Sequence, residues 1–175
     1  MKTVFLRRMA IIGIAVLAMS VSTAAQKKGD MDAGANLLFG TTSGYSNVGL
    51  GAKFRYNVTN PIRLAGEFDY FLKKNYINFW DFSVYGNYLF PVAPKFVVYP
   101  SVGLGVVGST VHVPDIDLFG EKVGGGSVSG SDFAISLGGG ADYELSPNLT
   151  LNGELRYKTL SGGWFNILVG VAYRF

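Results

Sequence analysis

Residues 149–159 read LTLNGELRYKT and residues 164–175 read WFNILVGVAYRF. In both stretches the odd-numbered positions are mostly apolar, and the even-numbered positions hold all the charges, Glu154, Arg156, Lys158 and Arg174. A β-strand places alternate side chains on opposite faces, whereas a helix repeats about every 3.6 residues. The two stretches are therefore predicted to be strands with one apolar face and one polar face.

The same alternation occurs eight times after residue 30, and turn-forming residues separate the runs. Runs of about ten residues are long for a globular strand but suit a tilted strand that crosses a bilayer. Short Pro-bearing connections alternate with longer ones, of which residues 109–131 are the longest and are predicted to be a flexible Gly- and Ser-rich loop. We predict an all-β fold, an eight-stranded antiparallel up-and-down transmembrane β-barrel, with strands at 31–40, 47–58, 62–72, 78–90, 95–108, 132–145, 149–159 and 164–175.

The volume of the alternating side chains decides which face points outward. A soluble barrel of the lipocalin type also alternates, but it holds its apolar side chains inside. Here the apolar positions carry many aromatic rings, whereas the opposite positions carry many small residues, such as Gly103, Gly105, Gly138 and Gly140. A narrow barrel cannot enclose that many rings. The bulky apolar face is therefore predicted to face lipid, and the small residues are predicted to line the lumen.

The charged residues of the strands share the positions of the small residues. Because an Arg or Lys on the lipid face costs about 2–4 kcal/mol at the bilayer midplane, this segregation is what a membrane barrel requires. Buried charges need partners, so we predict a cross-strand network in the lumen, with Lys53 near Glu67. The predicted network contains Lys53, Arg55, Arg63, Glu67, Asp69, Asp81, Asp142, Glu144, Glu154, Arg156, Lys158 and Arg174, and Asp32 and Asp132 share their face.

Aromatic residues also mark the ends of the predicted strands. An even number of strands places both termini on the same, periplasmic side. One interfacial band is predicted at that side, from Tyr56, Tyr88, Tyr143 and Tyr173, and a second near the opposite rim, which includes Tyr70, Trp80 and Tyr157. Pro100 lies within the fifth predicted strand, where it removes a hydrogen-bond donor and predicts a local bulge or irregularity.

The N-terminal segment has the features of an export signal. Residues 1–8 are basic, residues 9–19 are apolar over about half the length that a membrane-spanning helix needs, and small residues follow at 22–25. We predict a signal peptide at 1–25, cleaved after Ala24 or Ala25, and a barrel domain at 26–175. The mature chain then has 12 basic and 12 acidic residues, so its charge does not favour a nucleic-acid partner.

The signal segment, the eight alternating strands and the last strand, 165–175, resemble the small outer-membrane barrels of the OmpX, OmpA-transmembrane and opacity-protein kind. This resemblance implies a bacterial outer-membrane location, with lipid and lipopolysaccharide as surroundings. It also implies that Tyr173 and Phe175 form a signal for the barrel assembly machinery. Members of such families differ in role, so the resemblance indicates location more than activity.

Three functional classes stay open at this point. The preferred one is a non-enzymatic envelope protein whose loops, mainly 109–131, form a structural or interaction surface with an unknown partner. A narrow channel is the second, although eight strands leave little open interior. The third is a lipid-modifying enzyme based on His112, the single histidine, with Ser109, Asp115 and Asp117 nearby in sequence. The chain has no Cys for a thiolate metal site, and Gly103, Gly105 and Gly108 spell G-x-G-x-x-G but precede no helix pattern, so we predict neither a metal nor a cofactor.

Overall fold

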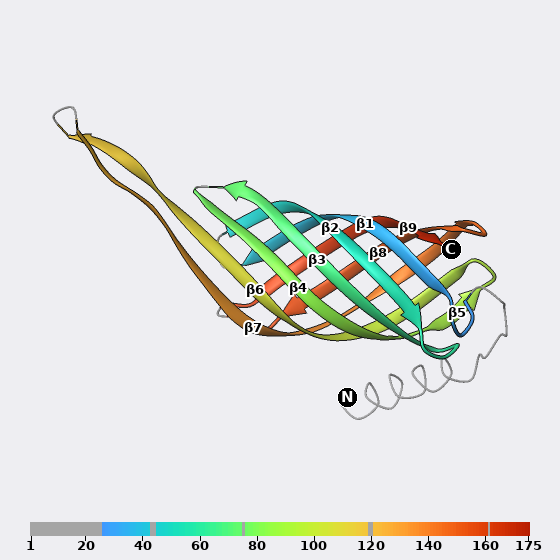
Figure 1. Cartoon of the computed structure of the whole chain (residues 1–175). Helices are drawn as coiled ribbons and strands as arrows, with labels where there is room; N and C mark the ends of the chain where they lie inside the picture. Colours follow the sequence, from blue (N-terminus) through green and yellow to red (C-terminus); the bar gives the residue numbers. More distant parts are fainter. Residues whose placement is uncertain (1–25, 43–44, 75, 119–120, 161) are drawn as a thin grey trace, which may run out of the picture.

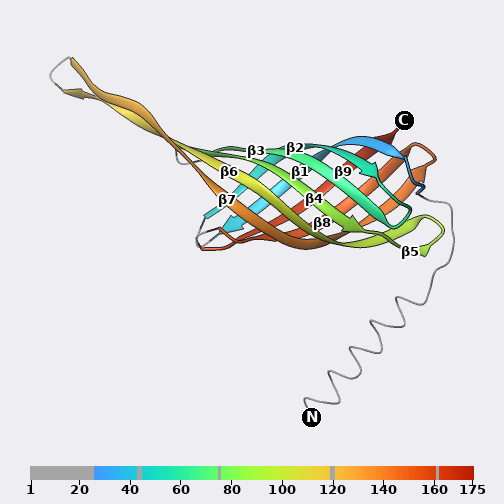
Figure 2. The same ribbon diagram turned by 60° about the horizontal axis from the view of Figure 1, so that its bottom comes forward.

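The structure is a computed structural model that describes residues 26–42, 45–74, 76–118, 121–160 and 162–175. Strands dominate these residues and wind around a common axis (Figures 1 and 2). They are β1 (Met31–Thr42), β2 (Tyr45–Asn57), β3 (Ile62–Lys74), β4 (Ile77–Tyr88), β5 (Phe90–Ala93), β6 (Phe96–Leu118), β7 (Glu121–Ser146), β8 (Leu149–Lys158) and β9 (Trp164–Arg174). The described part of the chain holds no helix long and apolar enough to cross a membrane. The predicted signal peptide, 1–25, lies outside the described residues.

Hydrogen-bonded pairing closes the sheet into a barrel. The strand order β4-β3-β2-β1-β9-β8-β7-β6-β5 is antiparallel throughout and is completed by pairing between β4 and β6. The short β5 pairs with β6 beyond the end of β4, so β4 and β5 share one position in the wall. The predicted eight-stranded antiparallel barrel is therefore confirmed. Asp32 lies opposite Arg174 in the β1–β9 pair, and we call this end of the barrel the terminal end.

The alternating side chains divide between the two surfaces of the wall. Leu37, Leu104 and Leu155 are each more than half exposed on the outer surface, whereas Arg63 is fully buried in the lumen. Small residues make room for the buried side chains. A Cβ on Gly140, for example, would lie 2.7 Å from the Tyr99 ring and would displace it. The apolar face thus points outward, as the volume argument predicted.

Pro100 disturbs the wall on one side only. The register between β6 and β7 shows no shift at Pro100↔Gly139, so no bulge interrupts the β6–β7 pair. On the other side, the pairing of β4 with β6 ends at Asn87↔Ser101, and it resumes with β5 at Phe90↔Val98. Since Pro has no N–H, the missing ladder bond falls opposite Pro100. The predicted irregularity therefore lies in the neighbouring strand position.

The predicted loop at 109–131 is a two-stranded β-ribbon, so that prediction was wrong. β6 and β7 keep one register from Phe96↔Tyr143 to Leu118↔Glu121. β4 pairs with β6 only as far as Val111, and β8 pairs with β7 only as far as Ser136. Beyond these points β6 and β7 extend alone past the rim (Figures 1 and 2). We call residues 109–118 and 121–131 the ribbon, of which residues 109–111 still pair with β4, and we call its side of the barrel the ribbon end.

The ribbon forms because β-branched residues stand among its many Gly and Ser residues. Val111 lies directly opposite Val128, and the neighbouring Thr110 lies opposite Ser129, with 3.1 Å between their hydroxyl oxygens. β-branched residues favour extended backbone, and cross-strand pairs of this kind stabilise a hairpin. Glycine weakens a strand, but it still supplies the N–H and C=O groups that the ladder needs.

Candidate functional site

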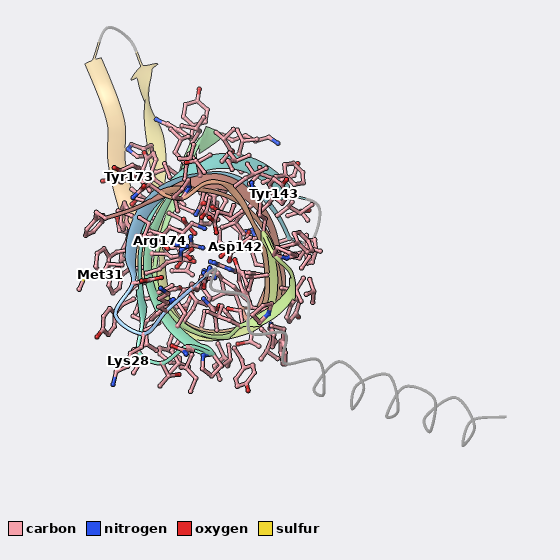
Figure 3. The ribbon with its side chains drawn as sticks, turned by 90° about the vertical axis from the view of Figure 1, so that its right-hand side faces the viewer. Lys28, Met31, Asp142, Tyr143, Tyr173 and Arg174 are labelled. Carbon is pink, nitrogen blue, oxygen red and sulfur yellow. The ribbon has the colours of Figure 1, made fainter. Side chains whose placement is uncertain are left out.

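The charged residues of the lumen form two clusters and a separate Lys158–Asp81 pair, and the first cluster lies toward the terminal end. Arg55 Nε donates to Asp32 Oδ1 at 2.5 Å, and Arg55 Nη1 lies 3.1 Å from Asp142 Oδ1. Arg63 Nη1 donates to the other oxygen of Asp142 at 2.6 Å, and its guanidinium stacks 4.5 Å from the centre of the Tyr99 ring. Figure 3 shows Asp142 within the ring of strands. Asp142 thus joins two cations from β2 and β3.

The second cluster lies near the middle of the barrel and is organised by Arg156. Its guanidinium binds both oxygens of Glu67, at 2.6 and 2.7 Å, and also pairs with Glu154. Lys53 Nζ contacts the other oxygen of Glu154 at 2.8 Å. The Arg156 guanidinium also lies over the Tyr85 ring, 3.9 Å from its centre. A planar guanidinium suits this arrangement because it offers five donors in a fixed fork.

Lys53 illustrates what the register alone could not decide. It lies directly opposite Glu67 in the β2–β3 pair, as its strand position indicated. Its ion pair, however, is with Glu154 from β8, across the lumen. The Arg156 fork occupies both oxygens of Glu67, so the ammonium of Lys53 turns to the other carboxylate. In a narrow lumen, a carboxylate across the barrel can be as near to a cation as the carboxylate on the neighbouring strand.

The remaining predicted network residues occupy different surroundings. Lys158 pairs with Asp81, which also accepts a hydrogen bond from the Ser83 hydroxyl at 2.5 Å. Asp69 is buried opposite Asp81, and its Oδ1 has no hydrogen-bond partner among the described residues. Glu144 and Arg174 lie half-buried at the terminal end, outside both clusters. Arg174 Nε is 3.8 Å from Asp30 there.

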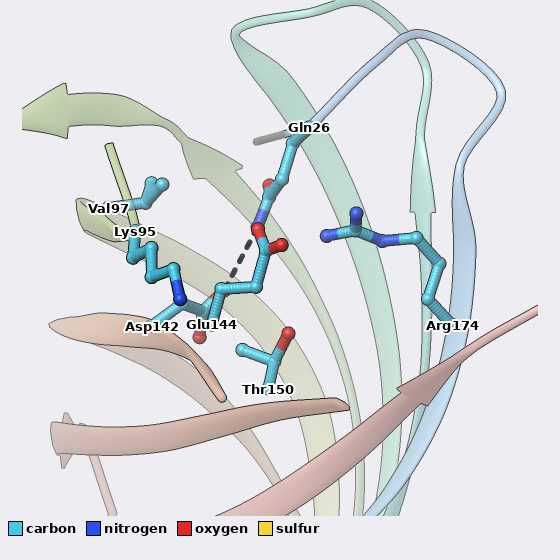
Figure 4. A pocket seen from close by; sticks show the side chains of 7 residues that line it. All are labelled: Gln26, Lys95, Val97, Asp142, Glu144, Thr150 and Arg174. Atoms are coloured by element: carbon cyan, nitrogen blue, oxygen red, sulfur yellow. Dashed lines mark hydrogen bonds between the residues drawn. The ribbon is translucent and has the colours of Figure 1, made fainter. Parts of the chain in front are cut away.

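A small cavity marks the mouth of the lumen at the terminal end (Figure 4). Gln26 lies across it and donates its side-chain amide to Asp142 Oδ2 at 3.3 Å. The cavity measures about 10 Å³, which is room for about one water molecule. Its lining also includes Lys95, Glu144 and Arg174. Such a cavity hydrates the charges at the mouth but is too small for an organic ligand.

An apolar plug closes the lumen at the ribbon end, and the sequence reasoning missed it. The Trp164 ring lies 4.9 Å from the Phe71 ring and 5.1 Å from the Phe79 ring. Leu38 and Leu168 pack in the same buried cluster. The available signal was that Phe71, Phe79 and Trp164 fall on the small-residue positions of their strands, against the general pattern. Large rings at those positions indicate a filled interior.

The aromatic residues named for the two bands lie on the outer surface. Tyr56, Tyr88, Tyr143 and Tyr173 are exposed toward the terminal end, as Figure 3 shows for the last two of them. Nearer the ribbon end, the predicted residues Tyr70, Trp80 and Tyr157 also lie on the outer surface, and Tyr70 faces Trp80 in the β3–β4 register. The predicted assembly-signal residues Tyr173 and Phe175 are both exposed, with 57% and 68% of their surface accessible.

The ribbon reverses the polarity of the two faces. Within the barrel, the outer face carries Leu104 and Val106 on β6, but the same face of the ribbon carries Thr110 and His112. The opposite face, which continues the lumen side, carries Val111 and Val113. A polar group placed in hydrocarbon without a partner costs several kcal/mol, so the reversal marks where the wall leaves an apolar environment.

One edge of the ribbon also leaves backbone groups unpaired with another strand. The last contacts of β7 with the segment after β8 are at Ile135, whose N–H and C=O point toward Thr159. Because backbone groups alternate in direction along an antiparallel strand, Ser127, Ser129 and Ser131 present theirs on the same side. No described strand pairs with β7 there. This edge is a template for an additional strand.

The arrangement of His112 does not support the predicted alternative of a catalytic triad. Ser109 and His112 are three residues apart on one strand, so their side chains lie on opposite faces of the ribbon. The backbone N–H of His112 donates to Tyr76 O at 2.8 Å, and the imidazole is half-buried. The side chains of Asp115 and Asp117 lie outside the described part of the structure.

A closed barrel with an apolar outer coat and a charged, plugged lumen defines a transmembrane β-barrel of the outer-membrane class. Comparison with known families agrees with this. The chain belongs to the outer membrane protein beta-barrel domain family, whose model matches residues 11–175. Family membership supports an outer-membrane location. No curated protein matches the chain.

Solved structures share the fold at low sequence identity. Ail, the attachment invasion locus protein of Yersinia pestis, is 21% identical with a TM-score of 0.57, over 85% of this chain and 99% of Ail. Neisserial surface protein A, NspA, is 18% identical with a TM-score of 0.60, over 83% and 96%. The N-terminal barrel domain of Pseudomonas aeruginosa OprF is 16% identical with a TM-score of 0.58, over 86% and 100%. At these identities the likeness concerns the fold alone.

Proposed function

We propose that this chain is a non-enzymatic integral outer-membrane protein whose barrel holds the ribbon outside the cell as an interaction surface. The observation that carries this proposal is the ribbon, which projects past the rim with an unpaired edge on β7. The filled lumen supports the proposal, because two ion-pair clusters and the Trp164 plug make the barrel a rigid anchor for the ribbon.

The chemistry of the ribbon favours an extended polypeptide as the partner. Backbone N–H and C=O groups at Ser127, Ser129 and Ser131 offer the spacing that an added strand requires. The small side chains at these positions leave room for the partner's own side chains. Val128, which is 69% exposed, adds an apolar contact on the face beside this edge. Main-chain bonds would supply affinity, and side chains beside the edge would supply selectivity.

Replacing residues 112–130 with a short Gly/Ser turn is expected to leave folding intact and to abolish partner capture. The replacement keeps every β4–β6 pair up to Ile77↔Val111 and every β6–β7 pair from Phe96↔Tyr143 to Gly108↔Ser131, so the heat-modifiable mobility of the barrel on a gel should not change. Capture is measured in the native host with a photo-crosslinking residue at Ser131, which the replacement retains. Leu104, on the lipid face, is the matched control position.

Two further variants separate the edge from the side chains. Ser129→Pro removes an outward N–H without removing a β6–β7 ladder bond, whereas Ser129→Ala removes only the hydroxyl. Loss of the Ser131 adduct in Ser129→Pro and its survival in Ser129→Ala support strand addition. Loss of folding in the turn replacement would show instead that the ribbon is structural, and an unchanged adduct would contradict the proposal.

The lumen contents argue against the channel alternative. Pure protein in a planar bilayer is expected to show no steady single-channel current, because the plug of Trp164, Phe71 and Phe79 closes one end of the lumen. The clusters around Asp142 and Arg156 fill the remainder. The measurement is current at a fixed voltage, with a known porin as the positive control. Sustained unitary currents would overturn the proposal.

We also propose export by the segment 1–25 and periplasmic placement of both termini, which puts the ribbon outside and Tyr173 and Phe175 where the assembly machinery meets the barrel. The basic and then apolar pattern of residues 1–19 supports export, and the exposed side chains of Tyr173 and Phe175 support access by the assembly machinery. The mature protein is expected to begin at Ala25 or Gln26 by N-terminal sequencing.

The orientation of the barrel is tested by labelling. A cysteine at Ser129 should react in intact cells with an impermeant maleimide, whereas one at Lys28 should not. The opposite labelling pattern would reverse the orientation.

A further inference from the structure

A groove of about 510 Å³ crosses the outer surface of the barrel in the half nearer the terminal end. The residues that line it come from β3, β4, β6 and β7, carry no charge, and include Ile62, Gly86, Tyr88, Pro100, Val102 and Leu137. They follow the register rows Ile62↔Tyr88, Gly86↔Val102 and Val102↔Leu137, so the groove runs across neighbouring strands. Volumes of this size are typical of small-molecule sites.

Two features of the sequence hollow the surface at this place. Gly86 faces outward without a side chain, and a Cβ built there would meet no atom within 4 Å. Beside it, the β4–β6 ladder stops at Asn87↔Ser101, opposite the N–H that Pro100 lacks. The walls are the exposed side chains of Tyr88, Val102 and Leu137, which are each between two-fifths and three-fifths exposed.

We propose that this groove holds one acyl chain of a phospholipid from the periplasmic leaflet. The family places this surface in a membrane, and the groove offers a mainly apolar lining, with Asn87 and Ser101 as its polar members and no ionic group for a headgroup to bind. The assignment to the periplasmic leaflet rests on the proposed orientation of the barrel. That leaflet is the phospholipid side of the outer membrane, and the groove lies toward the terminal end.

The preference for this position arises from packing. Apolar protein surface and lipid tails are equally apolar, so burial alone does not select one lipid-facing site over another. An unfilled hollow, however, forfeits dispersion contacts along its whole lining. A flexible chain that crosses the strands from Ile62 to Leu137 recovers those contacts. A site of this kind retains a lipid longer than the surrounding convex wall does.

The test uses the full mature chain in vesicles of phosphatidylethanolamine and phosphatidylglycerol, with a tracer phosphatidylethanolamine that carries a diazirine in one acyl chain. After illumination, mass spectrometry locates the labelled residues. Labelling at the groove is expected to exceed labelling around Gly66 about fivefold, which corresponds to about 1 kcal/mol at about 1.4 kcal/mol per tenfold. Gly66 is the matched control, because a Cβ there also meets no atom within 4 Å.

Gly86→Leu fills the groove floor and is expected to reduce groove labelling to the level around Gly66, whereas Gly66→Leu should leave groove labelling unchanged. Gel mobility shows that each variant folds. Uniform labelling of the lipid face, or groove labelling that survives Gly86→Leu, would overturn the proposal. So would stronger labelling of the groove by a lipopolysaccharide probe that carries the same diazirine. Both leaflets of the vesicle contain the same lipid, so failure of the proposed orientation leaves this result unaffected.

Discussion

Arg156→Met is expected to lower the free energy of unfolding by about 3–5 kcal/mol, the cost of removing one partner from a buried ion pair. The Arg156 guanidinium binds both oxygens of Glu67, at 2.6 and 2.7 Å, and also pairs with Glu154. Without it, Glu67 loses its only ion pair among the described residues, whereas Glu154 keeps Lys53. Urea titration in lipid vesicles, followed by the fluorescence of Trp80 and Trp164, measures the loss.

Two variants test whether the loss comes from the unpaired carboxylate. Arg156→Lys keeps the charge but not the fork, so its loss should be smaller. Adding Glu67→Gln to Arg156→Met should recover part of the stability, because no unpaired charge is then left at Glu67. A loss below about 1 kcal/mol in Arg156→Met, the value of an exposed ion pair, would show that water screens this cluster.

Leu104→Arg is expected to cost about 2–4 kcal/mol, the price of a cation near the bilayer midplane. Leu104 is 53% exposed on the outer face, within the portion of β6 that pairs with both β4 and β7. The energetic penalty is desolvation, not a clash, because the side chain already points away from the protein. The measurement is the same urea titration in vesicles.

Val113→Arg is the matched control for Leu104→Arg. Val113 has similar exposure, 51%, but lies on the ribbon beyond the last β4–β6 pair, Ile77↔Val111. Its substitution is expected to change stability by no more than about 0.5 kcal/mol, as is usual at solvated surface positions. An equal cost at the two positions would contradict the inferred boundary, because it would place both side chains in the same environment.

The alternation of apolar and polar residues was sufficient to predict the fold. Period two across residues 149–159 and 164–175 identified strands, and residue volume identified the outward face before any contact was known. Both inferences depend on local chemistry and on packing volume, which a sequence states directly. The lumen-facing positions of Arg63, Asp142 and Arg156 follow from the same parity.

The partners of the lumen charges depended on the closed barrel. Parity and register place Lys53 opposite Glu67, but the ammonium bonds Glu154, which is 101 residues away in the chain. Barrel closure brings β2 and β8 to opposite sides of one narrow space, and the side chains then choose by reach and by competition. The register of neighbouring strands carries no information about that distance.

The sequence by itself determined the strands, the outward apolar coat and the inward charges, because these follow from period and volume. The tertiary structure decided the Trp164 plug, the break opposite Pro100 and the groove beside Gly86, which arise where distant strands meet. It also decided that residues 109–118 and 121–131 form a ribbon. Their Gly and Ser content suggested a loop, but cross-strand hydrogen bonds, which composition does not report, hold them extended.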